Sequence, residues 1–168
     1  MKIIFIRHGE TNAKTGTLSL KGKLQSMFAR QYLKNEKVDE IFVSPQTRAL
    51  QTANILNKKF NVPLNILKEF DERDTLKMGQ IAGYKNEFTK NYLNYDFESE
   101  EYETCKKFVE RVFSGLNKIV EKNLNCVVIV GHSSSLYAIN AFVCGIPKDK
   151  KIKWLQCNNG AVIKFFVE

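Results

Sequence analysis

The two histidines of this 168-residue chain each follow a short apolar run. His8 comes after Ile3 to Ile6 and Arg7, and His132 comes after Val127 to Gly131. Such runs are typical of buried strands in a parallel sheet, and ligands bind where the carboxyl ends of parallel strands meet. We therefore predict that two distant segments bring their imidazoles to one crevice. The alternative, for either histidine taken alone, is a packed core residue.

Arginine is rare in this chain, so its positions are informative. Of the 26 basic residues, 21 are Lys and five are Arg, namely Arg7, Arg30, Arg48, Arg73 and Arg111. A guanidinium makes planar two-point contacts with anions that an ammonium cannot make. Because Arg7 lies directly beside His8, this pair of residues indicates a nucleophile whose target is an anion.

Strand-like and helix-like segments alternate along the chain, which predicts an α/β fold with a mostly parallel sheet and helices on both faces. The expected strands are residues 2–6, 40–43, 63–67, 126–130 and 161–167. The apolar run 126–130 should be the central strand, Pro63 favours an edge position for the third strand, and the alternation in 161–167 favours a final antiparallel edge strand.

Helical periodicity predicts helices at residues 20–34, 44–59, 104–121 and 133–143. The second helix is expected to begin with Ser44 as its N-cap and Pro45 in its first turn. The third has the clearest amphipathic pattern. The first carries an apolar stripe that consists of Leu24, Met27, Phe28 and Tyr32.

Residues 68–103 fit no simple strand and helix unit. The segment begins with a stretch rich in acidic residues, and six aromatic residues follow Gly83, namely Tyr84, Phe88, Tyr92, Tyr95, Phe97 and Tyr102. A long insertion in a compact domain usually serves function, so we expect a small cap over the crevice. The aromatic residues would form the core of the cap or stack on a substrate. The chain as a whole, residues 1–168, has the length and composition of a single domain.

Composition narrows the classes of partner. No segment is long and apolar enough for a signal peptide or a membrane span, so we expect a cytoplasmic protein without a membrane partner. The net charge of +8 comes from scattered lysines without a repeated motif, so we expect no nucleic-acid partner. The four cysteines show no zinc-site spacing and are expected to be buried, reduced thiols.

Three motifs in order along the chain resemble the histidine phosphatase superfamily, which has the phosphoglycerate-mutase-like fold. They are Arg7–Thr11 after the first strand, Ser44–Ala53 after the second, and Gly131–His132 after a late strand. Lesser matches to the family pattern are Leu18–Gly22, Phe108–Val112 and Asn158–Gly160. The resemblance spans most of the chain.

The resemblance implies an enzyme that transfers a phosphoryl group to a ring nitrogen of His8. That step needs a neutral imidazole, and the charges of Arg7 and Arg48 would disfavour the imidazolium. The same two arginines and His132 are implied to bind the phosphoryl oxygens and to stabilise the charge that spreads over them. These fixed groups take the place of a metal ion, so no metal and no cofactor is expected.

The leaving group needs a proton donor, normally a carboxyl group near the phosphate. The family takes this group from a Glu shortly after the third strand. By resemblance Glu72 is the first candidate and Glu69 the second. The segment from Glu72 to Gly83 is longer than the family pattern, which leaves open a solvated acidic loop without a catalytic role.

Two positions depart from the family pattern. Lys14 stands where mutases and many phosphatases have a phosphate-contacting Asn, and Asn12 lies two residues before it. Ser133 follows His132 in place of the frequent Gly. Asn12 and Ser133 are therefore secondary candidates for the site. The short loop before Leu18 is more similar to compact phosphatases, including those that act on phosphohistidine proteins, than to glycolytic mutases.

We therefore expect a metal-independent phosphatase that hydrolyses a phosphomonoester or phosphohistidine through a phosphohistidine intermediate on His8. Its substrate would be a phosphorylated small molecule or a phosphoprotein. A phosphoglycerate mutase is the alternative enzyme, although the chain is shorter than those that usually carry that activity. A catalytically weak module that binds phosphorylated ligands is the alternative outside enzymes, and it depends on the irregular segment around Glu72.

Overall fold

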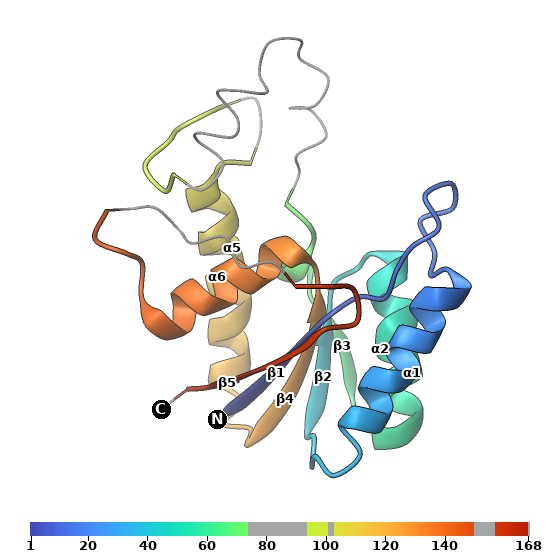
Figure 1. The fold of residues 1–168 in the computed structure, drawn as a ribbon. Coiled ribbons are helices and arrows are strands. Elements are labelled where there is room, and N and C mark those ends of the chain that lie inside the picture. Colours follow the sequence, from blue (N-terminus) through green and yellow to red (C-terminus); the bar gives the residue numbers. More distant parts are fainter. Residues whose placement is uncertain (74–93, 101–102, 150–156, 168) are drawn as a thin grey trace.

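A five-stranded sheet forms the centre of the fold (Figure 1). The computed structural model describes residues 1–73, 94–100, 103–149 and 157–167. The strands are β1 (Lys2–Arg7), β2 (Glu40–Val43), β3 (Leu64–Ile66), β4 (Cys126–Gly131) and β5 (Val162–Phe166). The helices are α1 (Leu20–Tyr32), α2 (Thr47–Phe60), α5 (Cys105–Val120) and α6 (Ser133–Cys144), together with the short 3₁₀ helix η1 (Lys68–Phe70).

The order of the strands is β3-β2-β4-β1-β5. Strands β1, β2 and β3 belong to the parallel part of the sheet with β4, whereas β5 runs antiparallel to β1. All six residues of β4 are buried, and this strand lies in the middle. The expected mixed α/β sheet is confirmed, including its apolar central strand, its third strand at one edge and its antiparallel strand at the other.

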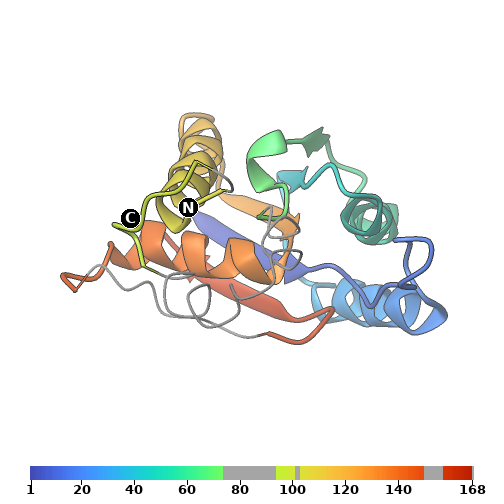
Figure 2. The same ribbon diagram turned by 90° about the horizontal axis from the view of Figure 1, so that it is seen from above.

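Helices cover both faces of the sheet because successive strand residues point in opposite directions. In β1, Ile3 and Phe5 pack into one apolar cluster with residues of α5 and α6. Ile4 and Ile6 pack into a second cluster with residues of α1 and α2. Seen from above, α1 and α2 lie on one side of the sheet and α5 and α6 on the other (Figure 2).

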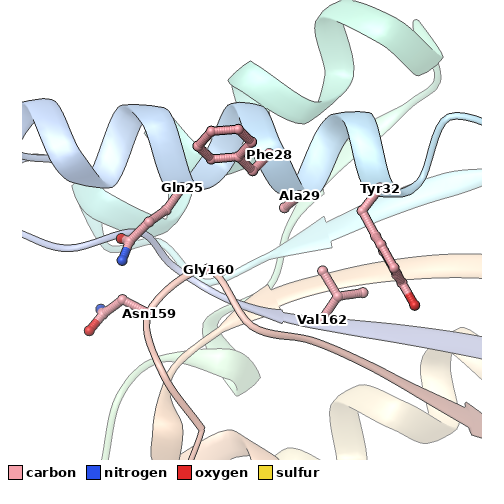
Figure 3. Close-up of a pocket in the computed structure, with 7 residues that line it drawn as sticks. All are labelled: Gln25, Phe28, Ala29, Tyr32, Asn159, Gly160 and Val162. Carbon is pink, nitrogen blue, oxygen red and sulfur yellow. The ribbon is translucent and has the colours of Figure 1, made fainter.

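The apolar stripe of α1 faces solvent. Such a stripe usually faces the core, but Phe28 is 73% exposed and Tyr32 is 68% exposed. The helix packs inward through small residues, Gly22, Ser26 and Ala29. Phe28 and Tyr32 border a pocket of about 340 Å³ between α1 and the chain that leads into β5 (Figure 3).

The predicted start of the second helix is wrong. Helix α2 begins at Thr47 with Gln46 as its N-cap, and Ser44 and Pro45 precede it. The Ser44 hydroxyl is directed to another partner, because it lies 2.8 Å from Nε2 of His132. Ser44 and Pro45 therefore lie in the loop between β2 and α2, and the Ser44 hydroxyl contacts His132 instead of capping the helix.

The expectations for the cysteines and for the cap can be compared with the structure only in part. Cys105 and Cys126 are buried as expected, but Cys144 is exposed and Cys157 is half-buried. Of the expected cap at 68–103, the structure describes residues 68–73, 94–100 and 103, so four of its aromatic residues lie outside the described part, namely Tyr84, Phe88, Tyr92 and Tyr102. In the described ranges, none of the helices has the length and apolar character needed to cross a bilayer.

Candidate active site

The register of the sheet brings the two histidines together. Arg7 at the end of β1 pairs with Gly131 at the end of β4, so His8 and His132 are the next residues of adjacent strands. The backbone N–H of His8 donates to the Gly131 carbonyl over 3.0 Å. The two ring centroids lie 5.2 Å apart in an edge-to-face arrangement. His132 is fully buried and His8 is 6% exposed.

His8 is held in one tautomer. Its Nδ1 lies 2.7 Å from the Gly9 carbonyl oxygen, and because a carbonyl only accepts, Nδ1 carries the proton. Nε2 is therefore unprotonated and accepts a hydrogen bond from Arg48 Nε over 3.1 Å. Burial lowers the pKa of His8 from 6.5 to about 4, and the Gly9 bond opposes this shift. The charges of Arg48 and Arg7, on which the prediction relied, lower the pKa further, but burial contributes more than either arginine.

Close backbone packing fixes the loop that carries His8. A Cβ atom on Gly9 would lie 2.3 Å from the carbonyl oxygen of Gly22, and one on Gly22 would lie 2.0 Å from that of Glu10. Only glycine fits at either position. The Gly9 N–H donates to Thr52 Oγ1 over 3.1 Å. The Glu10 N–H donates to Gln25 Oε1 over 2.8 Å, so α1 and α2 both hold this loop.

The turn before β5 supports the same loop from the other side. Asn159 Nδ2 donates to the carbonyl oxygen of His8 over 3.1 Å. The Gly160 N–H donates to the Arg7 carbonyl over 3.0 Å. Asn159 and Gly160 also line the pocket beside α1, together with Gln25 (Figure 3). One wall of that pocket therefore consists of residues that hold His8 in place.

His132 is the N-cap residue of α6, and its ring is held through the opposite nitrogen. Nε2 lies 2.8 Å from Ser44 Oγ. Nδ1 lies 3.4 Å from Arg48 Nη2 and 3.7 Å from Glu72 Oε2. Burial, and then the neighbouring His8 and Arg48, lower the pKa of His132 to about 2. Both imidazoles are therefore neutral at physiological pH.

Arg48 connects the two histidines with the acidic segment. It lies in the first turn of α2, and its side chain is 18% exposed. Its Nε donates to His8. Its Nη2 contacts His132 and forms an ion pair with the Glu72 carboxylate. One guanidinium thus touches three of the predicted site residues.

Arg7 reaches the same edge of the sheet from β1. Its Nη1 donates to the Cys157 carbonyl over 2.5 Å. Its Nε is buried and has no acceptor among the residues that the structure describes. A buried charged donor without an acceptor is costly. Arg7 can therefore supply a hydrogen bond to an anion that binds beside His8.

The two candidate acids have different surroundings. Glu72 pairs with Arg48 and lies near His132, and its side chain is 44% exposed. Glu69 lies in η1 and pairs with Lys118 of α5 over 2.5 Å. The hydrogen bond from Lys118 lowers the pKa of Glu69. Of these two carboxylates, the fold brings Glu72 to the histidines and holds Glu69 against α5.

The secondary candidates lie at the margin of this group. Asn12 is in an exposed turn, where its Oδ1 accepts the N–H of Lys14 over 2.9 Å. Ser133 is the half-buried first residue of α6. Within the described ranges, no three or more His, Cys, Asp and Glu side chains gather as a group that could hold a metal ion.

Sequence reasoning missed several residues that hold the site together. Ser44 was interpreted as a helix cap, and Gln46 and Asp71 had no assigned role. Gln46 Nε2 donates to Asp71 Oδ1 over 2.7 Å, and the same oxygen accepts the Glu72 N–H over 2.8 Å. No pattern in the sequence marks this connection, because its members are 25 residues apart and become neighbours only in the folded chain.

Two further residues that support the site, Arg73 and Arg111, could have been identified from the sequence, because arginine is rare in this chain. Arg73 is 3% exposed and donates to the Glu103 carbonyl over 3.0 Å and to Tyr137 Oη over 3.3 Å. Arg111 binds the Glu103 carboxylate and the backbone of the acidic segment. A chain that uses Lys by default has therefore placed Arg at four positions around this site.

Comparison with known proteins covers nearly the whole chain. The family model of the histidine phosphatase superfamily (branch 1) matches residues 3–167. Uncharacterized phosphatase PhoE from Bacillus subtilis is 30% identical over 154 residues, which are 85% of this chain and 77% of that protein. Phosphoglycerate mutase 1 from Saccharomyces cerevisiae is 32% identical over 127 residues, which are 67% of this chain but 44% of the mutase.

Solved structures share the fold. The mycobacterial glucosyl-3-phosphoglycerate phosphatase superposes with a TM-score of 0.83 over 97% of this chain and 88% of its own. The two sequences are 18% identical, so this likeness concerns the arrangement of strands and helices.

Proposed function

Since the chain belongs to the histidine phosphatase superfamily (branch 1), we propose that it is a phosphatase that works through a phosphohistidine intermediate on His8. The phosphatase-named relative, which aligns over most of its own length, supports the hydrolytic class.

The state of His8 is the observation that carries this proposal. Its Nδ1–H donates to the Gly9 carbonyl, so a lone pair remains on Nε2. The lowered pKa of about 4 keeps the ring neutral at physiological pH. Nucleophilic catalysis needs an unprotonated nitrogen at a fixed place, and the backbone contacts of Gly9 hold the ring there.

In the first step, His8 Nε2 attacks phosphorus, a nitrogen–phosphorus bond forms, and the bond to the leaving oxygen breaks. Arg7 and Arg48 bind the non-bridging phosphoryl oxygens. The buried Arg7 Nε, which has no acceptor among the described residues, supports this role. Ser44 Oγ lies 2.8 Å from His132 Nε2, and in the proposed mechanism its hydroxyl donates to that nitrogen, so that His132 donates from Nδ1 to a phosphoryl oxygen. Such fixed donors stabilise the charge of the transition state without a metal ion.

Glu72 gives its proton to the leaving oxygen and later takes a proton from the water that cleaves the nitrogen–phosphorus bond. The products are an alcohol and inorganic phosphate, and His8 returns to its neutral form. In this mechanism the substrate phosphate replaces Glu72 as the partner of Arg48, which frees the carboxyl group to hold a proton. The position of Glu72 beside His132 and its partial exposure support this role, because the group must reach both substrate and water. Glu69 is paired with Lys118 instead.

The proposed substrate is a phosphorylated small molecule or a phosphoprotein. The short loop before Leu18, which is more similar to compact phosphatases than to glycolytic mutases, favours hydrolysis over transfer to a second acceptor. A screen of phosphorylated metabolites and a phosphohistidine protein would identify the substrate. Product analysis in the same screen separates the two reactions, since a mutase returns a phosphorylated isomer and a phosphatase releases inorganic phosphate.

Trapping of the intermediate tests the mechanism. The protein is mixed with a radiolabelled aryl phosphate and quenched rapidly, and the label should lie on His8 in a form labile in acid and stable in base. Turnover should persist in EDTA, and His8→Ala should show neither label nor turnover. Loss of activity in EDTA that a divalent cation restores would overturn the mechanism. Binding of phosphate without turnover would favour a binding module.

A further inference from the structure

The guanidinium of Arg111 uses all of its nitrogens in contacts with two parts of the chain. Nε and Nη2 donate to the two carboxylate oxygens of Glu103 over 2.6 and 2.8 Å. Nη1 lies within hydrogen-bond distance of three backbone carbonyls in one short segment, those of Lys68 (3.2 Å), Glu69 (2.9 Å) and Asp71 (3.2 Å). A side chain of α5 therefore holds the backbone of η1 and of the residue after it.

The segment that Arg111 holds leads directly into Glu72. The residue before Glu72 is Asp71, whose carboxylate accepts both the Glu72 N–H and the Nε2 of Gln46 at the start of α2. The chain that enters Glu72 is therefore fixed from two helices on opposite faces of the sheet, α5 through Arg111 and α2 through Gln46.

The chain that leaves Glu72 is anchored at Glu103, the residue whose carboxylate also binds Arg111. Arg73 is almost fully buried, and its Nε donates to the Glu103 carbonyl. Glu103 thus binds Arg111 through its carboxylate and Arg73 through its main chain. The Glu72 side chain is 44% exposed and contacts Arg48 at its tip, so the place of its carboxylate depends on this backbone frame as well as on Arg48.

We infer that Arg111 is a positioning residue, which sets the place of the Glu72 carboxylate beside His132 and Arg48 by holding the carbonyls of residues 68, 69 and 71. The inference rests on the proposed function, in which Glu72 is the general acid. Lysine cannot replace Arg111, because one ammonium cannot make the two-point contact with Glu103 and reach the carbonyls at the same time. The guanidinium also packs over the Phe108 ring at 5.0 Å, which fixes its plane.

Displacement of a general acid affects substrates unequally. A poor leaving group such as an alkyl alcohol needs the proton, whereas a nitrophenolate leaves without it. We expect Arg111→Lys to lower kcat/KM for an alkyl phosphate by roughly 10- to 100-fold. For an aryl phosphate the fall should be less than about threefold. A merely structural role would slow both reactions alike.

Lys118→Met is the matched control. Lys118 lies on the same helix and contacts the same segment, but it binds the Glu69 side chain and not a backbone carbonyl. An exposed ion pair of this kind contributes little, so both reactions should stay within about twofold of the wild type. A control variant with the leaving-group dependence of Arg111→Lys would overturn the assignment to Arg111.

A double-mutant cycle tests whether Arg111 acts through Glu72. In a Glu72→Gln background, Arg111→Lys should lower alkyl phosphate turnover little further, because the group that it positions is already gone. A full additional loss in that background, or equal losses on both substrates, would overturn the inference. If Arg111→Lys does not fold, as judged by its Tm, Glu103→Gln is measured in the same way and should show a smaller loss confined to the alkyl substrate.

The same measurements separate this inference from the proposed function. A wild-type protein without turnover that depends on His8 would contradict the proposed function, and the positioning role would fall with it. A His8-dependent phosphatase in which neither Arg111→Lys nor Glu103→Gln discriminates between leaving groups would contradict the positioning role alone.

Discussion

The two imidazoles present opposite ring nitrogens to the site, and the difference comes from the atom that holds each ring. His8 is held at Nδ1 by the carbonyl of Gly9. His132 is held at Nε2 by the hydroxyl of Ser44. A carbonyl only accepts, so His8 must keep a lone pair on Nε2. A hydroxyl both accepts and donates, so Ser44 allows the tautomer proposed for His132, in which Nδ1, on the side of Glu72, carries the proton.

Two similar sequence positions therefore provide two different chemical groups. Both histidines follow an apolar strand, and both have lowered pKa values because both are buried. Burial makes each ring neutral, but the hydrogen-bond partner decides which nitrogen faces the substrate. The roles proposed above, a nucleophile at His8 and a hydrogen-bond donor at His132, follow from this difference.

The largest effect is expected when the two histidines are removed one at a time. His8→Ala removes the covalent route, and kcat/KM for an aryl phosphate should fall by about 10⁴-fold or more. His132→Ala removes one donor to the transition state and should cost roughly 10²- to 10³-fold. Rapid quenching should still trap phosphate on His8 in the second variant. Equal losses without a trapped intermediate in either would show that the two rings do not differ in role.

Arg48→Lys should remove the guanidinium that contacts both imidazole rings. Lysine keeps the charge but cannot contact both histidines through a planar fork, so we expect turnover to fall by about 100-fold. Orthovanadate, a mimic of the five-coordinate transition state, should inhibit the wild type and bind the variant more weakly. Near-normal turnover in Arg48→Lys would contradict the phosphate-binding role.

Glu72→Gln should affect the side of the site that His132 faces. We expect hydrolysis of an alkyl phosphate to fall by about 100-fold or more, with a much smaller loss on an activated aryl phosphate. Glu69→Gln is the matched control and should resemble the wild type on both substrates, because Glu69 pairs with Lys118. If the difference between substrates appears in Glu69→Gln, the acid has been assigned to the wrong residue.

The lowered pKa values predict a loss of stability in mild acid. The unfolded chain takes up protons on both histidines near pH 6.5, whereas in the folded protein the pKa is about 4 for His8 and about 2 for His132. Between these values the unfolded state binds more protons, so the free energy of unfolding falls as the pH is lowered and is fully retained above pH 6.5. The fall should be about 2 kcal/mol per histidine down to about pH 5.

Urea unfolding at several pH values measures this dependence. His132→Asn should show a shallower decrease than the wild type between pH 6.5 and about 5, because one of the two displaced titrations is gone. If the wild type and the variant lose stability in parallel, His132 does not titrate as its burial indicates.

Ser44→Ala should have the smallest effect, and it tests the hydroxyl that distinguishes His132 from His8. Without Ser44 Oγ, His132 Nε2 loses its partner, and the proton is no longer directed to Nδ1. We expect turnover to fall by about 3- to 10-fold while a phosphohistidine still forms on His8. Unchanged kinetics would show that the tautomer of His132 does not depend on Ser44.

Strand periodicity was sufficient to predict the sheet. A fully apolar run such as 126–130 is buried on both faces only in a central strand, and β4 lies in the centre. The start of α2 was less predictable than the other helix starts, because the Ser44 hydroxyl contacts His132 instead of capping the helix. The apolar stripe on α1 did not show which face of the helix is buried. Gly22 packs closely against the backbone of Glu10, so the face with the small residues Gly22, Ser26 and Ala29 points inward.

The family, the sheet and the candidates His8, Arg7, Arg48 and His132 could be predicted from the amino-acid sequence, because motifs and strand patterns can be recognised in short stretches of the chain. The tertiary structure decided which of the two acids faces the histidines, through contacts of η1 with α5 and of Asp71 with α2. It also decided which nitrogen of each ring faces the site. Tautomers and side-chain directions depend on partners that are distant in sequence, and only the packing of the folded chain selects among those partners.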